Sequence, residues 1–180
     1  TVTSLVNITA INDAPVATAG RTMSYTENDP ATVIDNTINL TDLDSTNLQS
    51  ATVKITSGLT TGDVLGITAQ NNIVGSYDAA TGVLTLSGNS TVANYQTALR
   101  TVTYLSTSNN PTGISATRTI TWQVNDGSSA NNLSANVTST INVTESNTPP
   151  NAVAGATLAY TENGSAAAID TTILLSDPDN

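Results

Sequence analysis

The sequence predicts an all-β protein made of tandem antiparallel sandwiches, and two observations carry this prediction. Apolar and polar residues alternate with period two along much of the chain, as in strands that bury one face. The chain also resembles itself at an offset of 135 residues, because residues 1–45 and 136–180 share 23 identities over 45 aligned positions. Self-similarity at a fixed long period is typical of repeat proteins. We therefore expect two-sheet units joined end to end.

The repeat offset divides the chain into three parts. Residues 12–146 are expected to form one complete unit, residues 1–11 the last strand of a preceding unit, and residues 147–180 the first strands of a following unit. A complete unit of this length can bury a core of ordinary size without disulfides or structural metals. We interpret the chain as a segment of a longer repetitive protein, with any export signal or anchor outside it.

The complete unit is expected to contain seven to nine strands and no more than one short helix. Turns rich in Gly, Pro, Asn and Asp separate the alternating segments. The helical candidate is Thr91 to Arg100, where Val92, Tyr95 and Leu99 recur at helical spacing. The strands are expected near residues 16–25, 33–41, 49–57, 63–68, 73–77, 82–87, 101–106, 116–125 and 133–144.

Residues in the apolar phase of these segments are expected to form the core. Ile120, Trp122 and Val124, for example, alternate with polar residues along one strand. The predicted core residues are Val53, Ile55, Leu84, Leu86, Leu99, Tyr104, Ile120, Trp122 and Val124.

The composition excludes several classes of partner and of chemistry. Fourteen acidic residues stand against four basic ones, which gives a net charge of −10, and the chain has neither His nor Cys. Nucleic acids and anionic membranes attract clustered Lys and Arg, so we expect this segment to contact neither. The absence of Cys excludes disulfides and thiolate sites, and a Cys-free chain rich in Thr, Asn and Ser suits an extracellular or cell-surface location.

The acidic loops are expected to gather at the two ends of the unit. If the strands run up and down as in an immunoglobulin-like sandwich, the loop at 42–47 and the hairpin at 125–132 share the end where the chain enters. Asp42, Asp44 and Asp126 would then converge near Asn12 and Asp13. Glu27 would lie at the opposite end, beside the linker at Asn147, where Asp177 and Asp179 repeat the Asp-x-Asp pair at an offset of 135.

Three short motifs resemble the calcium motifs of cadherin repeats: Tyr-Thr-Glu27-Asn, Asp42-Leu-Asp44 and the linker Asn12-Asp13-Ala-Pro. The longer pattern from Gly75 to Gly88, followed by the segments 95–104 and 124–127, resembles the cadherin-like tandem repeats of giant bacterial surface proteins and adhesins. The resemblance implies Ca²⁺ between successive units. It implies the ligands Glu27, Asn147, Asp177 and Asp179 at the downstream junction and Asn12, Asp13, Asp42, Asp44 and Asp126 at the upstream one. The linker is one residue shorter than in animal cadherins, and Thr148 stands at the position of Asp13.

The residue chemistry agrees with this interpretation and leaves one alternative open. Ca²⁺ is a hard cation that takes six to eight oxygen ligands, which Asp, Glu, Asn and backbone carbonyls supply. Asp42 and Asp44 would also serve as ordinary turn formers, but their recurrence at Asp177 and Asp179 favours calcium. For Asp126, within Asn-Asp-Gly, the hairpin and ligand interpretations stay equally open.

The function expected from these observations is structural. We expect a calcium-braced spacer or fibre-forming repeat of a large secreted or cell-surface bacterial protein, such as an adhesin stalk or extracellular filament. Its partners would be neighbouring repeats of the same chain and other copies in a filament. The alternative is an adhesion module that recognises glycan or protein through its loops. No catalytic residues are assigned, because the sequence offers no nucleophile–base pair. Paired carboxylates would suit a glycosidase by residue type alone, but tandem repetition disfavours an enzyme.

Overall fold

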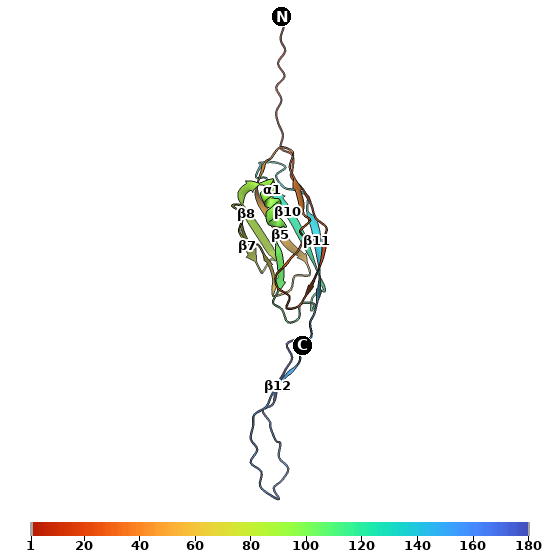
Figure 1. Ribbon diagram of the computed structural model, residues 1–180, viewed down its shortest axis with the longest axis vertical. Helices are drawn as coiled ribbons and strands as arrows, with labels where there is room; N and C mark the ends of the chain where they lie inside the picture. The colour runs from red at the N-terminus through yellow and green to blue at the C-terminus, as the bar shows by residue number, and fades with distance from the viewer. Residues whose placement is uncertain (1, 180) are drawn as a thin grey trace.

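The computed structural model describes residues 2–179 and contains one large unit with an extended segment at each end (Figure 1). The unit holds eleven strands and one helix. Its elements are β1 (Val16–Thr18), β2 (Thr22–Thr26), β3 (Thr32–Val33), β4 (Asn39–Thr41), β5 (Asn47–Ser57), β6 (Asp63–Gly66), β7 (Val74–Asp78), β8 (Val83–Thr91), α1 (Val92–Leu99), β9 (Thr103–Ser106), β10 (Thr117–Asn125) and β11 (Val137–Thr144).

The strands lie in two layers around one core. A six-stranded sheet in the order β2-β11-β10-β5-β8-β7 forms one layer, and the sheet β3-β9-β6 and the pair β1-β4 lie against its inner face. Side chains alternate along each strand, as in β10, where Ile120, Trp122 and Val124 are at most 1% exposed. This arrangement confirms the all-β sandwich. All nine residues predicted for the core are buried.

The unit has more strands than the seven to nine predicted, because two expected strands are each divided. The segment 16–25 is divided into β1 and β2, and the segment 33–41 into β3 and β4. The Asp35 carboxylate accepts the backbone amides of Gly20 at 3.2 Å, Arg21 at 3.0 Å and Thr37 at 2.8 Å. These amides bond to a side chain instead of to a neighbouring strand. Each of the two segments therefore stops pairing with one strand near Asp35 and pairs with a different strand beyond it.

One edge of the large sheet also differs from the antiparallel prediction. β2 runs parallel to β11, with Met23 opposite Ile141 and Tyr25 opposite Val143. The division of the first segment explains this, because β1 pairs antiparallel with β4 while β2 crosses to the opposite layer. The sheet is therefore mixed at this edge and antiparallel elsewhere.

The helix α1 forms where the sequence predicted it. Thr91 caps it by accepting the amide of Asn94 at 3.2 Å, which satisfies one of the free donors of the first turn. Tyr95, Ala98 and Leu99 are buried on one side. Gln96 and Arg100 fasten the helix to the strand beneath: Gln96 Oε1 accepts the amide of Leu40 at 2.9 Å, and Arg100 Nε donates to the carbonyl of Ile38 at 2.7 Å.

The two ends of the chain project from opposite ends of the unit (Figure 1). Residues 2–11, expected as a strand of a preceding unit, form no strand and are exposed. Residues 147–179 form a narrow ribbon that pairs β12 (Asn151–Val153) with β13 (Leu174–Ser176). Thr1 and Asn180, which belong to the expected outer segments, lie outside the described residues. Over the described part of the chain, no helix is long and apolar enough to cross a membrane.

The stability of the unit should fall in acid because of Asp35. Burial opposes ionisation of Asp35, but bonds from the Thr37 and Ser139 hydroxyls and from backbone amides outweigh it and hold the pKa below its ordinary value. A depressed folded pKa gives stability that is complete above the unfolded value, near 4, and is lost as pH falls through the folded pKa. The slope of unfolding free energy against pH should drop in Asp35→Asn by up to about 1.4 kcal/mol per pH unit. Urea titrations between pH 5 and 2 measure it.

Candidate metal centres at the two junctions

At the upstream junction, the Asn12 side chain holds the linker against the hairpin at residues 126–132. Its amide nitrogen donates to Asp126 Oδ2 at 2.8 Å and lies 3.2 Å from the carbonyl of Ala130 and 3.1 Å from that of Asn131. Its carbonyl oxygen accepts the hydroxyl of Ser128 at 2.8 Å. These hydrogen bonds attach the linker to the hairpin where the chain enters the unit.

The Asp-x-Asp loop lies beside this linker. Asp44 Oδ2 accepts the amide of Asp13 at 3.1 Å, and Asp42 Oδ1 accepts the amides of Asp44 at 3.2 Å and Ser45 at 2.9 Å. Asp44 and Asp126 therefore contact the linker at Asp13 and Asn12, as the predicted loop order required, and Asp42 is bonded to Asp44 within the same loop. The Asp13 side chain is exposed.

Both oxygens of Asp126 are engaged by neighbours. Oδ1 accepts the amide of Ser128 at 2.7 Å, and Oδ2 accepts Asn12. Burial opposes ionisation, yet the bonds from Ser128, Asn12 and Ser45 are sufficient to hold the pKa of Asp126 below its ordinary value. This carboxylate is ionised near neutral pH and positions the hairpin, and a role as ligand stays a prediction.

At the downstream junction, carboxylates contact the linker from both sides. Glu27 is 4% exposed, and its Oε2 accepts the amide of Ser146 at 3.0 Å. Asp179 Oδ2 accepts the amide of Thr148. Asn147 thus lies between two residues whose amides are bound, one by the sandwich and one by the ribbon.

The two junctions have the same local geometry. The Asp179 amide donates to Asp177 Oδ1 at 3.2 Å, as the Asp44 amide does to Asp42 Oδ1. Thr148 supplies to Asp179 the backbone amide that Asp13 supplies to Asp44. The substitution of Thr148 for Asp13 therefore preserves this bond and removes only a carboxylate.

The donor atoms suit a hard cation, although the carboxylates are spread out. Within residues 2–179, no three His, Cys, Asp or Glu side chains form a group that could hold a metal ion. Two buried side-chain oxygens in this part of the chain have no hydrogen-bond partner, and both belong to the Asp-x-Asp motifs: Asp42 Oδ2 and Asp179 Oδ1. A buried acceptor without a partner costs about 1–3 kcal/mol. A cation completed by amide, carbonyl and water oxygens would remove this cost.

A buried ion pair lies away from both junctions and was not predicted from the sequence. Arg118 and Asp63 are fully buried and form an ion pair at 2.6 Å. Asp63 also accepts the hydroxyl of Tyr104 at 2.6 Å, and Arg118 donates to the carbonyls of Pro111 at 2.6 Å and Ser115 at 2.5 Å. The sequence did contain one indication that Arg118 is buried: it stands in the same strand phase as Ile120, Trp122 and Val124 and so points into the core.

Comparison with known proteins gives one informative similarity. No protein-family model matches the chain. Halomucin of Haloquadratum walsbyi is 37% identical over 108 residues, which cover 57% of this chain and 1% of halomucin. The chain therefore spans a very small part of that relative, which is a polypeptide of great length.

Proposed function

We propose that this chain is a calcium-braced spacer unit of a large cell-surface protein. The observation that carries the proposal is the pair of buried carboxylate oxygens without donors, Asp42 Oδ2 and Asp179 Oδ1, one in each Asp-x-Asp motif beside a linker. The cadherin-like resemblance favours the same position for the ion.

The downstream junction is the clearest case. Glu27 and Asp179 belong to different structural parts, and both accept amides of the linker that joins them. Glu27, Asp177 and Asp179 do not form a metal-holding group in the described part of the structure, so Ca²⁺ would draw them together with the side chain or carbonyl of Asn147 and thereby connect the sandwich directly to the ribbon. Because ligation fixes their relative orientation, it would convert a hinge into a stiff joint.

A structural role agrees with the rest of the molecule. The halomucin similarity supports a large, extracellular cell-surface protein, and the all-β architecture with acids in end loops supports a non-enzymatic module. Repetition of such units would give length. The longest strand, β5, has 11 residues, and at 3.4 Å per residue each unit would add about 37 Å.

The direct test measures bending of the full chain with calcium and with chelator. Small-angle scattering should show less flexibility between the sandwich and the ribbon when Ca²⁺ is added. Calcium should also stabilise the native state, by about 2.7 kcal/mol per site at one hundred times the dissociation constant. Calorimetric titration with CaCl₂ gives that constant.

Paired variants assign the response to one junction. Asp177→Asn with Asp179→Asn should abolish the effect of calcium on bending while leaving the sandwich folded. The matched control, Asp42→Asn with Asp44→Asn, changes the equivalent residues of the upstream junction and should leave downstream bending calcium-dependent. Identical scattering in calcium and chelator would refute the brace and leave these acids as turn residues.

A further inference from the structure

The ribbon at residues 147–179 reproduces part of the local structure of residues 12–44, namely the β1-β4 pair and the bonds of Asp35. The pairing of Asn151 with Ser176 repeats that of Val16 with Thr41 at the same 135-residue offset. Asp170 accepts the amides of Gly155 at 3.1 Å, Ala156 at 3.0 Å and Thr172 at 2.7 Å, as Asp35 does from Gly20, Arg21 and Thr37. The ribbon is therefore already shaped as the opening part of a sandwich.

Its apolar residues, however, are exposed. Five positions that are at most 6% exposed in the complete unit are 38–79% exposed in the ribbon. The buried residues are Met23, Tyr25, Ile34, Ile38 and Leu40, and their counterparts are Leu158, Tyr160, Ile169, Ile173 and Leu175. This pattern is that of half a core, since each of the five counterparts in the complete unit is buried.

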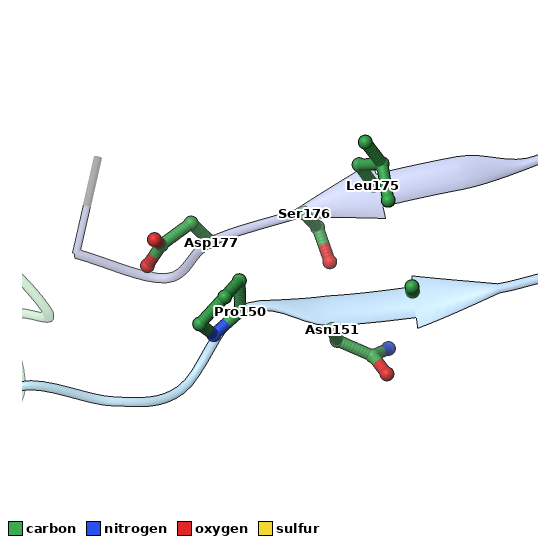
Figure 2. A pocket seen from close by; sticks show the side chains of 6 residues that line it. Pro150, Asn151, Leu175, Ser176 and Asp177 are labelled. Atoms are coloured by element: carbon green, nitrogen blue, oxygen red, sulfur yellow. The ribbon is translucent and has the colours of Figure 1, made fainter.

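Part of this surface is a hollow of about 430 Å³ lined by Pro150, Ala152 and Leu175 among others. Figure 2 shows Leu175 projecting from β13 on the side opposite to Ser176. The counterparts Pro15, Ala17 and Leu40 are all buried in the complete unit. The hollow is therefore the place where core residues of a sandwich belong.

The complete unit shows what covers this surface. Helix α1 packs on β4, with Gln96 bound to the amide of Leu40 and Arg100 bound to the carbonyl of Ile38. Strand β11 supplies Ser139, whose hydroxyl donates to Asp35 Oδ2 at 2.7 Å and accepts Trp122 Nε1 at 3.0 Å. A segment that covers the ribbon should likewise offer a Gln side chain to Leu175, an Arg side chain to Ile173 and a serine hydroxyl to Asp170.

We infer that the apolar face of residues 147–179 is a preformed acceptor for a segment with the chemistry of residues 46–146. The occupant is a helix bearing the Gln and Arg of α1, together with strands that bring a serine hydroxyl to Asp170. This inference is independent of calcium, because every contact that carries it lies on the sheet faces and in the helix.

The test attaches a second copy of residues 46–146 after Asn180, which occupies the position of Ser45 in the repeat. The added segment then follows the ribbon as it follows residues 12–45 in the complete unit. Amide hydrogen exchange, measured in chelator, should show protection in β12 and β13 rising by about 100-fold or more over the original chain.

Two adjacent leucines provide a matched pair of variants. Leu174 and Leu175 are 70% and 78% exposed, but their counterparts differ, because Asn39 is exposed and Leu40 is 6% exposed. In the extended protein, Leu175→Asp should abolish the added protection and Leu174→Asp should retain it. In the original chain, both changes should leave the sandwich equally stable.

Either of two results would overturn the inference. One is an extended protein whose ribbon exchanges as fast as in the original chain, and the other is an equal effect of the two leucine substitutions. Both readouts are taken in chelator, so neither depends on whether calcium stiffens the junction.

Discussion

Arg118→Met should destabilise the sandwich by about 3–5 kcal/mol, because it leaves the buried carboxylate of Asp63 without its charged partner. Both side chains are fully buried. Asp63 would keep the Tyr104 hydroxyl and the amide of Thr60 at 2.9 Å, but two neutral donors do not replace a guanidinium in a medium of low polarity. Urea unfolding at pH 7, followed by tryptophan fluorescence, measures the loss.

Two comparisons separate the charge effect from lost packing. Lys54→Met removes an exposed charge from the outer face of β5 and should change stability by less than about 0.5 kcal/mol. The double variant Arg118→Met with Asp63→Leu removes both charges, and it should recover much of the loss because an apolar pair of similar volume can replace a buried ion pair. If Arg118→Met were as stable as Lys54→Met, the ion pair of Arg118 and Asp63 would not stabilise this fold.

Trp122→Ala should also cost about 3–5 kcal/mol, in this case through a cavity at the centre of the large sheet. Trp122 is 1% exposed, and its indole N–H donates to Ser139, which donates in turn to Asp35. The substitution therefore removes a large side chain and one end of a buried hydrogen-bond chain. Because it also removes the only tryptophan, circular dichroism in urea is the appropriate measurement.

Two further substitutions separate the contribution of the indole donor and the buried volume from that of an exposed position on the same strand. Trp122→Phe retains most of the volume and loses the indole donor, so we expect a cost of about 1–3 kcal/mol from the unpaired polar group and residual cavity. Thr121→Ala alters the opposite face of the same strand and should cost less than about 1 kcal/mol. A loss below about 1 kcal/mol for Trp122→Ala would contradict its position in the core.

Much of the fold could be predicted from local pattern. The period-two alternation located the strands and placed Trp122 on the buried face, and the helical spacing around Tyr95 located α1 within one residue at each end. The order of the loops was sufficient to bring Asp44 to the upstream linker and Glu27 to the downstream one. The strand and helix positions depend on neighbours in sequence, and the loop contacts follow from the order of the strands in an immunoglobulin-like sandwich, so the sequence was sufficient to predict both.

The strand phases, the internal repeat and the acidic, cysteine-free chemistry of the loops can be read from the residues alone. The parallel pairing of β2 with β11, the division of two strands at Asp35 and the contact of Arg118 with Asp63 inside the core become visible only in the folded unit. The physical reason is distance along the chain. A pleat fixes which face a side chain occupies, but the partner that offsets a buried charge lies 55 residues away for Arg118 and is chosen only when the two sheets come together.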